Sequence, residues 1–89
     1  MTREALAALR SRLGWTQAQM AHAIGLTLRA YSSVENGHAE LRQLHALAAE
    51  RVALREAAAR GEPSLAPASV RKDAAAISSQ DWVAPRMVR

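Results

Sequence analysis

The chain has 89 residues, which suits one small domain with a modest core. It has no cysteine, which excludes disulfides, thiolate zinc sites and cysteine nucleophiles, and charged residues near its N-terminus argue against a signal peptide or membrane anchor. Twelve Lys and Arg residues against eight Asp and Glu give a net charge of +4, which fits an anionic partner such as nucleic acid and equally a merely basic soluble protein.

The first predicted element is an amphipathic helix over residues 3–13. Leu6, Leu9 and Leu13 recur at spacings of three and four residues, so they share one face of a helix. Thr2 suits the N-cap position of this helix. Gly14 stands where a left-handed residue would end it.

A second, shorter helix is predicted over residues 17–24. Thr16 and Gln19 have the spacing of a capping box, in which each side chain bonds the backbone of the other residue. Trp15 and Met20 flank them as a hydrophobic staple, which supports a structural role for Trp15.

A third helix follows after one turn. Thr27 repeats the capping signal, and the helix runs to about Asn36. Tyr31 and Val34 lie on its apolar side, where Tyr31 is expected to pack in the core. The other face is small and mostly polar, and it consists of Leu28, Arg29, Ser32 and Ser33. Two short helices joined by a tight turn, with such a face on the second, are typical of a helix-turn-helix.

Residues 41–59 predict one long fourth helix, because they lack Gly and Pro and are rich in Ala, Leu, Arg and Glu. Its apolar residues form two stripes, one of Leu41, Leu44, Ala48 and Val52 and the other of Leu47, Leu54 and Ala58. We expect one stripe to pack on the preceding helices and the other to pair with the same helix of a second subunit.

An irregular tail is predicted from Gly61 onward. Pro63 and Pro67 prevent the long helix from continuing. Within the tail, Val70, Ala74 and Ile77 can line a short helix, and an apolar end is formed by Trp82, Val83, Met87 and Val88. Residues 61–89 are therefore expected either to be partly disordered or to dock on a partner subunit.

The segment from Thr16 to Gly37 resembles the lambda-repressor-like (Xre/Cro-type) helix-turn-helix family. A Thr-Gln pair, an Ala, a Gly two positions before a Thr, and a final Glu-Asn-Gly carry the resemblance, which covers about residues 4–48. It implies an all-α fold: a small helical bundle that binds double-stranded DNA. After Gly37, the family's polar loop and two short helices are replaced by a short connector and one long helix. The resemblance therefore implies nothing about how subunits pair.

The resemblance also implies roles for individual residues. In the family, the Gln after the capping Thr touches the DNA backbone and the start of the third helix enters the major groove. The matching positions are Thr16, Gln17, Thr27, Leu28, Arg29, Ser32 and Ser33, with Asn36, His38 and Arg42 approaching phosphates. Arg29 can give a guanine two hydrogen bonds, and Leu28 can pack on a thymine methyl group. Arg10 is expected to pair with Glu35 and brace the domain.

We therefore predict a DNA-binding domain over residues 1–60 that dimerises through the long helix. The expected dimer interface consists of Leu44, Leu47, Arg51, Leu54 and Ala58. The predicted function is a dimeric repressor or autoregulator, bacterial or phage in origin, that reads a palindromic operator in the cytoplasm at the nucleoid. The alternative is an antitoxin or anti-activator that holds a protein partner through the long helix or the tail.

No catalytic or metal chemistry is predicted. His22, His38 and His45 lack the spacing of a metal site, and no nucleophile stands with a base and an acid. We expect no cofactor, no enzyme activity and no membrane insertion.

Overall fold

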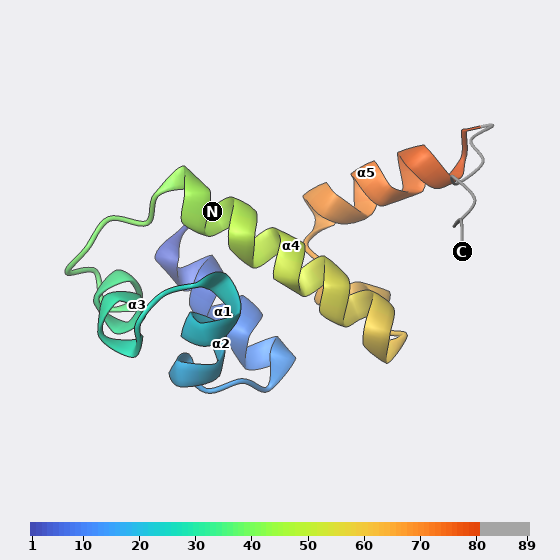
Figure 1. The fold of residues 1–89 in the computed structure, drawn as a ribbon. Coiled ribbons are helices and arrows are strands. Elements are labelled where there is room, and N and C mark those ends of the chain that lie inside the picture. Colours follow the sequence, from blue (N-terminus) through green and yellow to red (C-terminus); the bar gives the residue numbers. More distant parts are fainter. Residues whose placement is uncertain (81–89) are drawn as a thin grey trace, which may run out of the picture.

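The computed structural model describes residues 1–80, and over that range the chain is all-helical, as predicted, with no strand. The elements are α1 (Arg3–Leu13), α2 (Gln17–Ile24), α3 (Leu28–Glu35), α4 (Gln43–Arg60), a short 3₁₀ helix η1 (Pro63–Leu65) and α5 (Ala68–Ser78). α1, α2 and α3 gather on one side of the long α4, and α5 projects away from them (Figure 1). Within residues 1–80, no helix is apolar over a length that would cross a bilayer.

The first three helices begin and end where the capping residues predict. Thr2, Thr16 and Thr27 each accept a hydrogen bond from a backbone N–H three residues later, at 3.0 to 3.1 Å. Gly14 and Gly25 adopt left-handed backbone angles, with φ of 72° and 82°, and so end α1 and α2. These local signals fix the lengths of α1 and α2 and the start of α3.

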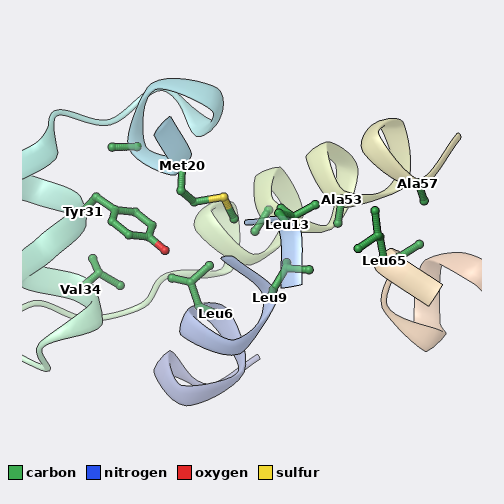
Figure 2. Packing of buried hydrophobic residues seen from close by; sticks show 12 residues of the cluster. Leu6, Leu9, Leu13, Met20, Tyr31, Val34, Ala53, Ala57 and Leu65 are labelled. Carbon is green, nitrogen blue, oxygen red and sulfur yellow. The ribbon is translucent and has the colours of Figure 1, made fainter. Parts of the chain in front are cut away.

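The core lies between α1, α2, α3 and α4 (Figure 2). α1 contributes its three predicted leucines, α2 contributes Met20 and Ala21, and α3 contributes Tyr31 and Val34. α4 contributes mainly alanines, and its buried residues are Ala46, Ala49, Val52, Ala53 and Ala57. Because alanine is small, the backbone of α4 can approach the other helices closely.

Neither of the two predicted stripes is the most deeply buried face of α4, although Leu41 of one stripe and Leu54 of the other pack partly against the core. Of the four residues Leu41, Leu44, Ala48 and Val52, only Val52 is buried, and Leu44 is 53% exposed. The physical reason is that the close approach of α4 favours its alanine face. Larger leucines on that face would hold the helices apart.

The packed unit continues past the boundary expected at residue 60. Gly61 is left-handed with a φ of 67°, which reverses the chain, and Pro63 starts η1. Leu65 is then only 5% exposed, and it and Ala66 join the core cluster. Leu65 and Ala66 thus belong to the core of their own chain, although both fall in the predicted tail.

The short helix predicted in the tail is present as α5. None of its residues 68–78 is buried, although Val70 packs partly against the core. Ser69 Oγ donates a hydrogen bond of 3.0 Å to Glu50 Oε2 and so ties α5 to α4. Ile77 is exposed. The apolar end of the predicted tail, Trp82 to Val88, lies outside the described residues.

Candidate nucleic-acid interface

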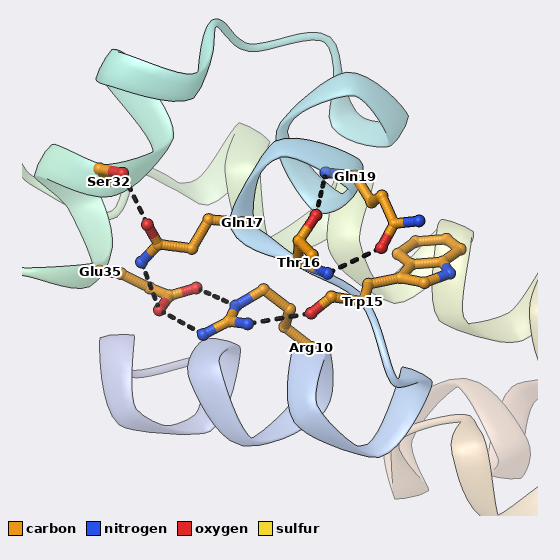
Figure 3. A network of polar contacts seen from close by, with 7 residues as sticks. All are labelled: Arg10, Trp15, Thr16, Gln17, Gln19, Ser32 and Glu35. Carbon is orange, nitrogen blue, oxygen red and sulfur yellow. Dashed lines mark hydrogen bonds and ion pairs between the residues drawn. The ribbon is translucent and has the colours of Figure 1, made fainter.

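An ion pair between α1 and the end of α3 sets the orientation of α3. Arg10 donates from Nε to Glu35 Oε2 at 2.7 Å and from Nη2 to Glu35 Oε1 at 3.0 Å (Figure 3). The third Arg10 nitrogen, Nη1, donates to the backbone oxygen of Trp15 at 2.9 Å. This arrangement confirms the predicted pair and extends it to the loop before α2.

Gln17, the first residue of α2, joins the same network. Its Nε2 donates to Glu35 Oε1 at 3.1 Å, and its Oε1 accepts from Ser32 Oγ at 2.8 Å (Figure 3). Both Gln17 and Ser32 are predicted DNA-contacting residues, and both are partly buried here. Their polar groups lock α2 onto α3, so the two helices of the motif present a fixed surface. The two contacts of Gln17 were not predicted from the sequence. The one available sign was that Ser32 and Glu35 lie one turn apart on α3, so that one side chain can reach both.

Arg10 and Glu35 are both charged, and the pair is partly buried. Burial alone would raise the pKa of Glu35, but the neighbouring polar groups of Arg10, Tyr31 and Gln17 outweigh it and leave that pKa below its ordinary value. The hydrogen bond to Glu35 raises the pKa of Arg10. The Glu35 side chain is only 6% exposed, so little solvent screens the attraction.

Tyr31 lies beside this pair within the core. Its side chain is fully buried, which confirms the core position predicted for it and excludes it from the exposed surface of α3. Its hydroxyl has no hydrogen-bond partner within residues 1–80. Burial raises the pKa of Tyr31, so the phenol is neutral under ordinary conditions.

The exposed surface of the motif begins at the N-terminal end of α3. Thr27, Leu28 and Arg29 are all exposed, and Leu28 keeps 51% of its surface open. Thr16 is also exposed, although its hydroxyl caps α2, as that of Thr27 caps α3. Leu28 and Arg29 are therefore consecutive exposed residues on α3, while the opposite face of α3 packs on the rest of the domain. This surface can offer an apolar contact and a bidentate donor together.

The connector between α3 and α4 lies next to this surface. A hollow of about 510 Å³ separates them, and its lining includes Thr27, Arg29, Ser33 and Arg42. The structure thus brings these four predicted residues together. Asn36 and His38 are exposed on the connector but do not line the hollow. The backbone N–H of Arg42 donates to His45 Nδ1 at 3.2 Å, which caps the start of α4.

Arg3 adds a positive charge that sequence reasoning missed. Gly37 has a φ of 80°, and the guanidinium of Arg3 occupies the space that a Cβ at Gly37 would fill. This contact places the guanidinium of Arg3 against the connector at Gly37, and its Nε also donates to Glu4 Oε1 at 3.4 Å. No sequence signal could have indicated the contact with Gly37, because the two residues are far apart in the chain.

Four of the five predicted dimer residues lie on the exposed side of α4. Leu44, Leu47, Arg51 and Ala58 are exposed, and Leu54 is partly buried. The dimer interface stays a prediction. No group of three metal-ligating side chains occurs among the residues that the structure describes.

Comparison with known families decides what this arrangement is. A helix-turn-helix family model matches residues 6–52, just over half of the chain. The chain belongs to the lambda-repressor-like (Xre/Cro-type) helix-turn-helix family. As a member of this family it is a DNA-binding helix-turn-helix regulator. Neither the curated proteins nor the solved structures gave a match.

Proposed function

We propose that this regulator is a sequence-specific repressor or autoregulator that binds a palindromic operator as a homodimer. The observation that carries the proposal is the exposed pair Leu28 and Arg29 on the first turn of α3, behind which Arg10 and Glu35 hold the helix in place. A helix with this exposed end fits the major groove of B-DNA. A DNA-bound function places the protein at the nucleoid.

Base recognition is assigned to the exposed residues of α3. Arg29 gives two hydrogen bonds to O6 and N7 of a guanine, a contact worth about 1 to 3 kcal/mol of discrimination. Leu28 packs on a thymine methyl group, and Ser33 bonds a base or a phosphate. Gln17 and Ser32 stand at the edge of this face and approach the DNA backbone as a pair.

Phosphate contacts are assigned to the connector and its surroundings. Asn36, His38 and Arg42 are exposed there, and the guanidinium of Arg3 lies against Gly37. Such contacts orient the protein on DNA without reading sequence. Each phosphate contact adds about 0.9 to the slope of log affinity against log salt, so binding weakens steeply as salt rises.

Homodimerisation is assigned to α4. Leu44 and Leu47 are 53% and 56% exposed on a helix that is otherwise well packed. Uncovered leucines one turn apart on a helix favour a helical partner. Two copies of the domain would then read the two halves of a palindrome about 34 Å apart.

A second candidate function is supported by α5. None of its residues is buried, and Ile77 keeps 52% of its surface exposed. An antitoxin or anti-activator could hold a protein partner on this helix while the motif binds DNA. Deletion of residues 67–89 separates the functions, since operator binding should survive and partner binding should not.

Selection of bound sites from a random DNA pool tests the leading proposal. The full chain should enrich a palindrome whose half-sites are about one turn, or 10 base pairs, apart. The Arg29→Ala variant should enrich sites with a relaxed base in each half. Arg12→Ala, an exposed arginine at the far end of α1, is the matched control and should enrich the same sites as the unmodified chain. Failure of the chain to enrich any sequence would contradict the proposal.

A further inference from the structure

The exposed side of α4 carries the repeat of a two-stranded coiled coil. Leu44, Leu47, Arg51, Leu54 and Ala58 follow one another at spacings of three, four, three and four residues. These are the a and d positions of a heptad, which lie along one seam of a helix. The buried alanines of α4 lie on the opposite side. The seam is therefore open to another helix at Leu44, Leu47 and Arg51, whereas Leu54 packs partly against the core and lies beside α5.

A groove opens at the C-terminal end of this seam. It lies between α4 and α5, has a volume of about 480 Å³, and is lined mostly by small apolar side chains, among them Leu54, Ala57, Ala58 and Ala74. Leu44 and Leu47, at the other end of the seam, are the most exposed large apolar residues of α4. One end of the seam thus offers projecting leucines, and the other end offers a recess into which a leucine fits.

The charge of Arg51 favours one relative direction of the two α4 helices over the other. In a parallel pair, equivalent a positions meet, and Arg51 would face Arg51 of the partner subunit. Like charges held together in an interface repel each other and so disfavour the parallel pair. In an antiparallel pair, a positions meet d positions, so Leu44 meets Leu54 of the partner subunit and Arg51 meets Leu47 of the partner subunit. The two arginines are then separated along the seam.

The antiparallel register also gives Arg51 a counter-charge. The apolar stem of Arg51 can lie over Leu47 of the partner subunit and extend its guanidinium towards Glu50 of the partner subunit. Glu50 flanks the seam and uses Oε2 to hold Ser69 of its own α5. The carboxylate is thereby oriented on the side of α4 where an approaching arginine needs it.

We propose that two copies of this chain pair antiparallel through α4, with Leu44 of each copy seated at the α4–α5 groove of the other. This inference rests on the homodimer of the proposed function and specifies its geometry. α3 lies near the N-terminal end of α4 (Figure 1), so antiparallel pairing carries the two DNA-reading helices to opposite ends of the dimer. Parallel pairing would bring them to the same end, where the two domains compete for space.

Engineered disulfides test the direction of pairing, because the chain has no cysteine of its own. The full-length Leu44→Cys and Leu54→Cys variants are oxidised separately and as a mixture. The antiparallel dimer predicts a covalent dimer in the mixture and little in either separate sample. If each variant forms covalent dimers on its own, and the mixture forms little disulfide between the two variants, the pairing is parallel. That result would overturn the proposal. Ser11→Cys, at an exposed site on α1, measures disulfides formed by random collision.

Two further readouts distinguish failure of this inference from failure of the proposed function. Sedimentation measures whether the chain is a dimer, and the random-pool selection measures DNA recognition. A monomeric chain that still enriches a DNA site overturns the pairing and leaves the reading of DNA by α3 standing. A chain that forms the mixed disulfide but enriches no DNA supports the pairing and overturns the proposed function.

Discussion

Arg10 and Glu35 are joined by two hydrogen bonds although 25 residues separate them in the chain. The pair links α1 to the last residue of α3, and Gln17 adds α2 to the same carboxylate. Residues of α1, α2 and α3 thus converge on the partly buried carboxylate of Glu35. The stability of the domain and the orientation of α3 should therefore depend on Glu35 and its donors.

Replacement of Arg10 tests this dependence. Arg10→Ala leaves the Glu35 carboxylate buried without its main counter-charge, so we expect the free energy of unfolding to fall by about 3 kcal/mol. Urea denaturation followed by circular dichroism measures the loss. Arg12→Ala removes an exposed arginine from the same helix and should change the value by less than about 0.5 kcal/mol. Equal losses of unfolding free energy in the two variants would show that the Arg10–Glu35 pair stabilises the domain no more than an exposed arginine does.

Stability should also depend on pH through Glu35. Its pKa is lower in the folded chain than the ordinary value of 4.5, so the folded state favours the charged form. The stabilisation is complete above pH 4.5 and is lost as the pH falls through the folded pKa. Glu35→Gln should flatten this part of a plot of unfolding free energy against pH. If the slope of unfolding free energy against pH is the same in Glu35→Gln, the pKa of Glu35 does not differ between the folded and unfolded states.

Tyr31→Phe should leave the domain as stable as before or raise its free energy of unfolding by up to about 1 kcal/mol. The buried hydroxyl has no partner within residues 1–80, so removing it takes away a desolvated polar group and leaves the ring in place. Thermal unfolding measures the difference. A marked fall in stability would show that the hydroxyl forms a bond that the structure does not contain.

Features set by neighbouring residues were predictable from the sequence. The caps formed by Thr2, Thr16 and Thr27 depend on a backbone N–H three residues away, so their spacing alone indicated where the helices begin. The Arg10–Glu35 pair spans a longer stretch, and only resemblance to a known family indicated it.

Features set by the approach of distant segments were not predictable. The two apolar stripes of α4 left open which of them packs on the core, and the most deeply buried residues, Ala49 and Ala53, lie outside both, because the spacing between helices depends on the whole core. The bond between Gln17 and Ser32 likewise requires α2 and α3 to meet at one particular angle. Leu65 follows a proline and a glycine, which indicate that a helix ends but not where the chain goes next.

Leu65 therefore provides a further prediction. Leu65→Ala removes a core side chain that is 5% exposed, and we expect the free energy of unfolding to fall by about 2 to 5 kcal/mol. Ile77→Ala, at a site that is 52% exposed, should have little effect. Denaturation of both variants of the full chain makes the comparison. If both are neutral, residues 61–66 do not form part of the folded unit.

The most direct test of base reading by α3 is the base preference of Arg29→Ala. It is measured by equilibrium binding to the selected operator and to operators with single base changes. The account predicts that the variant loses about 1 to 3 kcal/mol of discrimination at one base of each half-site and keeps its preferences elsewhere. Arg42→Ala should instead weaken binding to all of these DNAs alike and reduce the salt slope. An Arg29→Ala variant that retains every base preference, or an unmodified chain that prefers no DNA even at low ionic strength, would contradict the account.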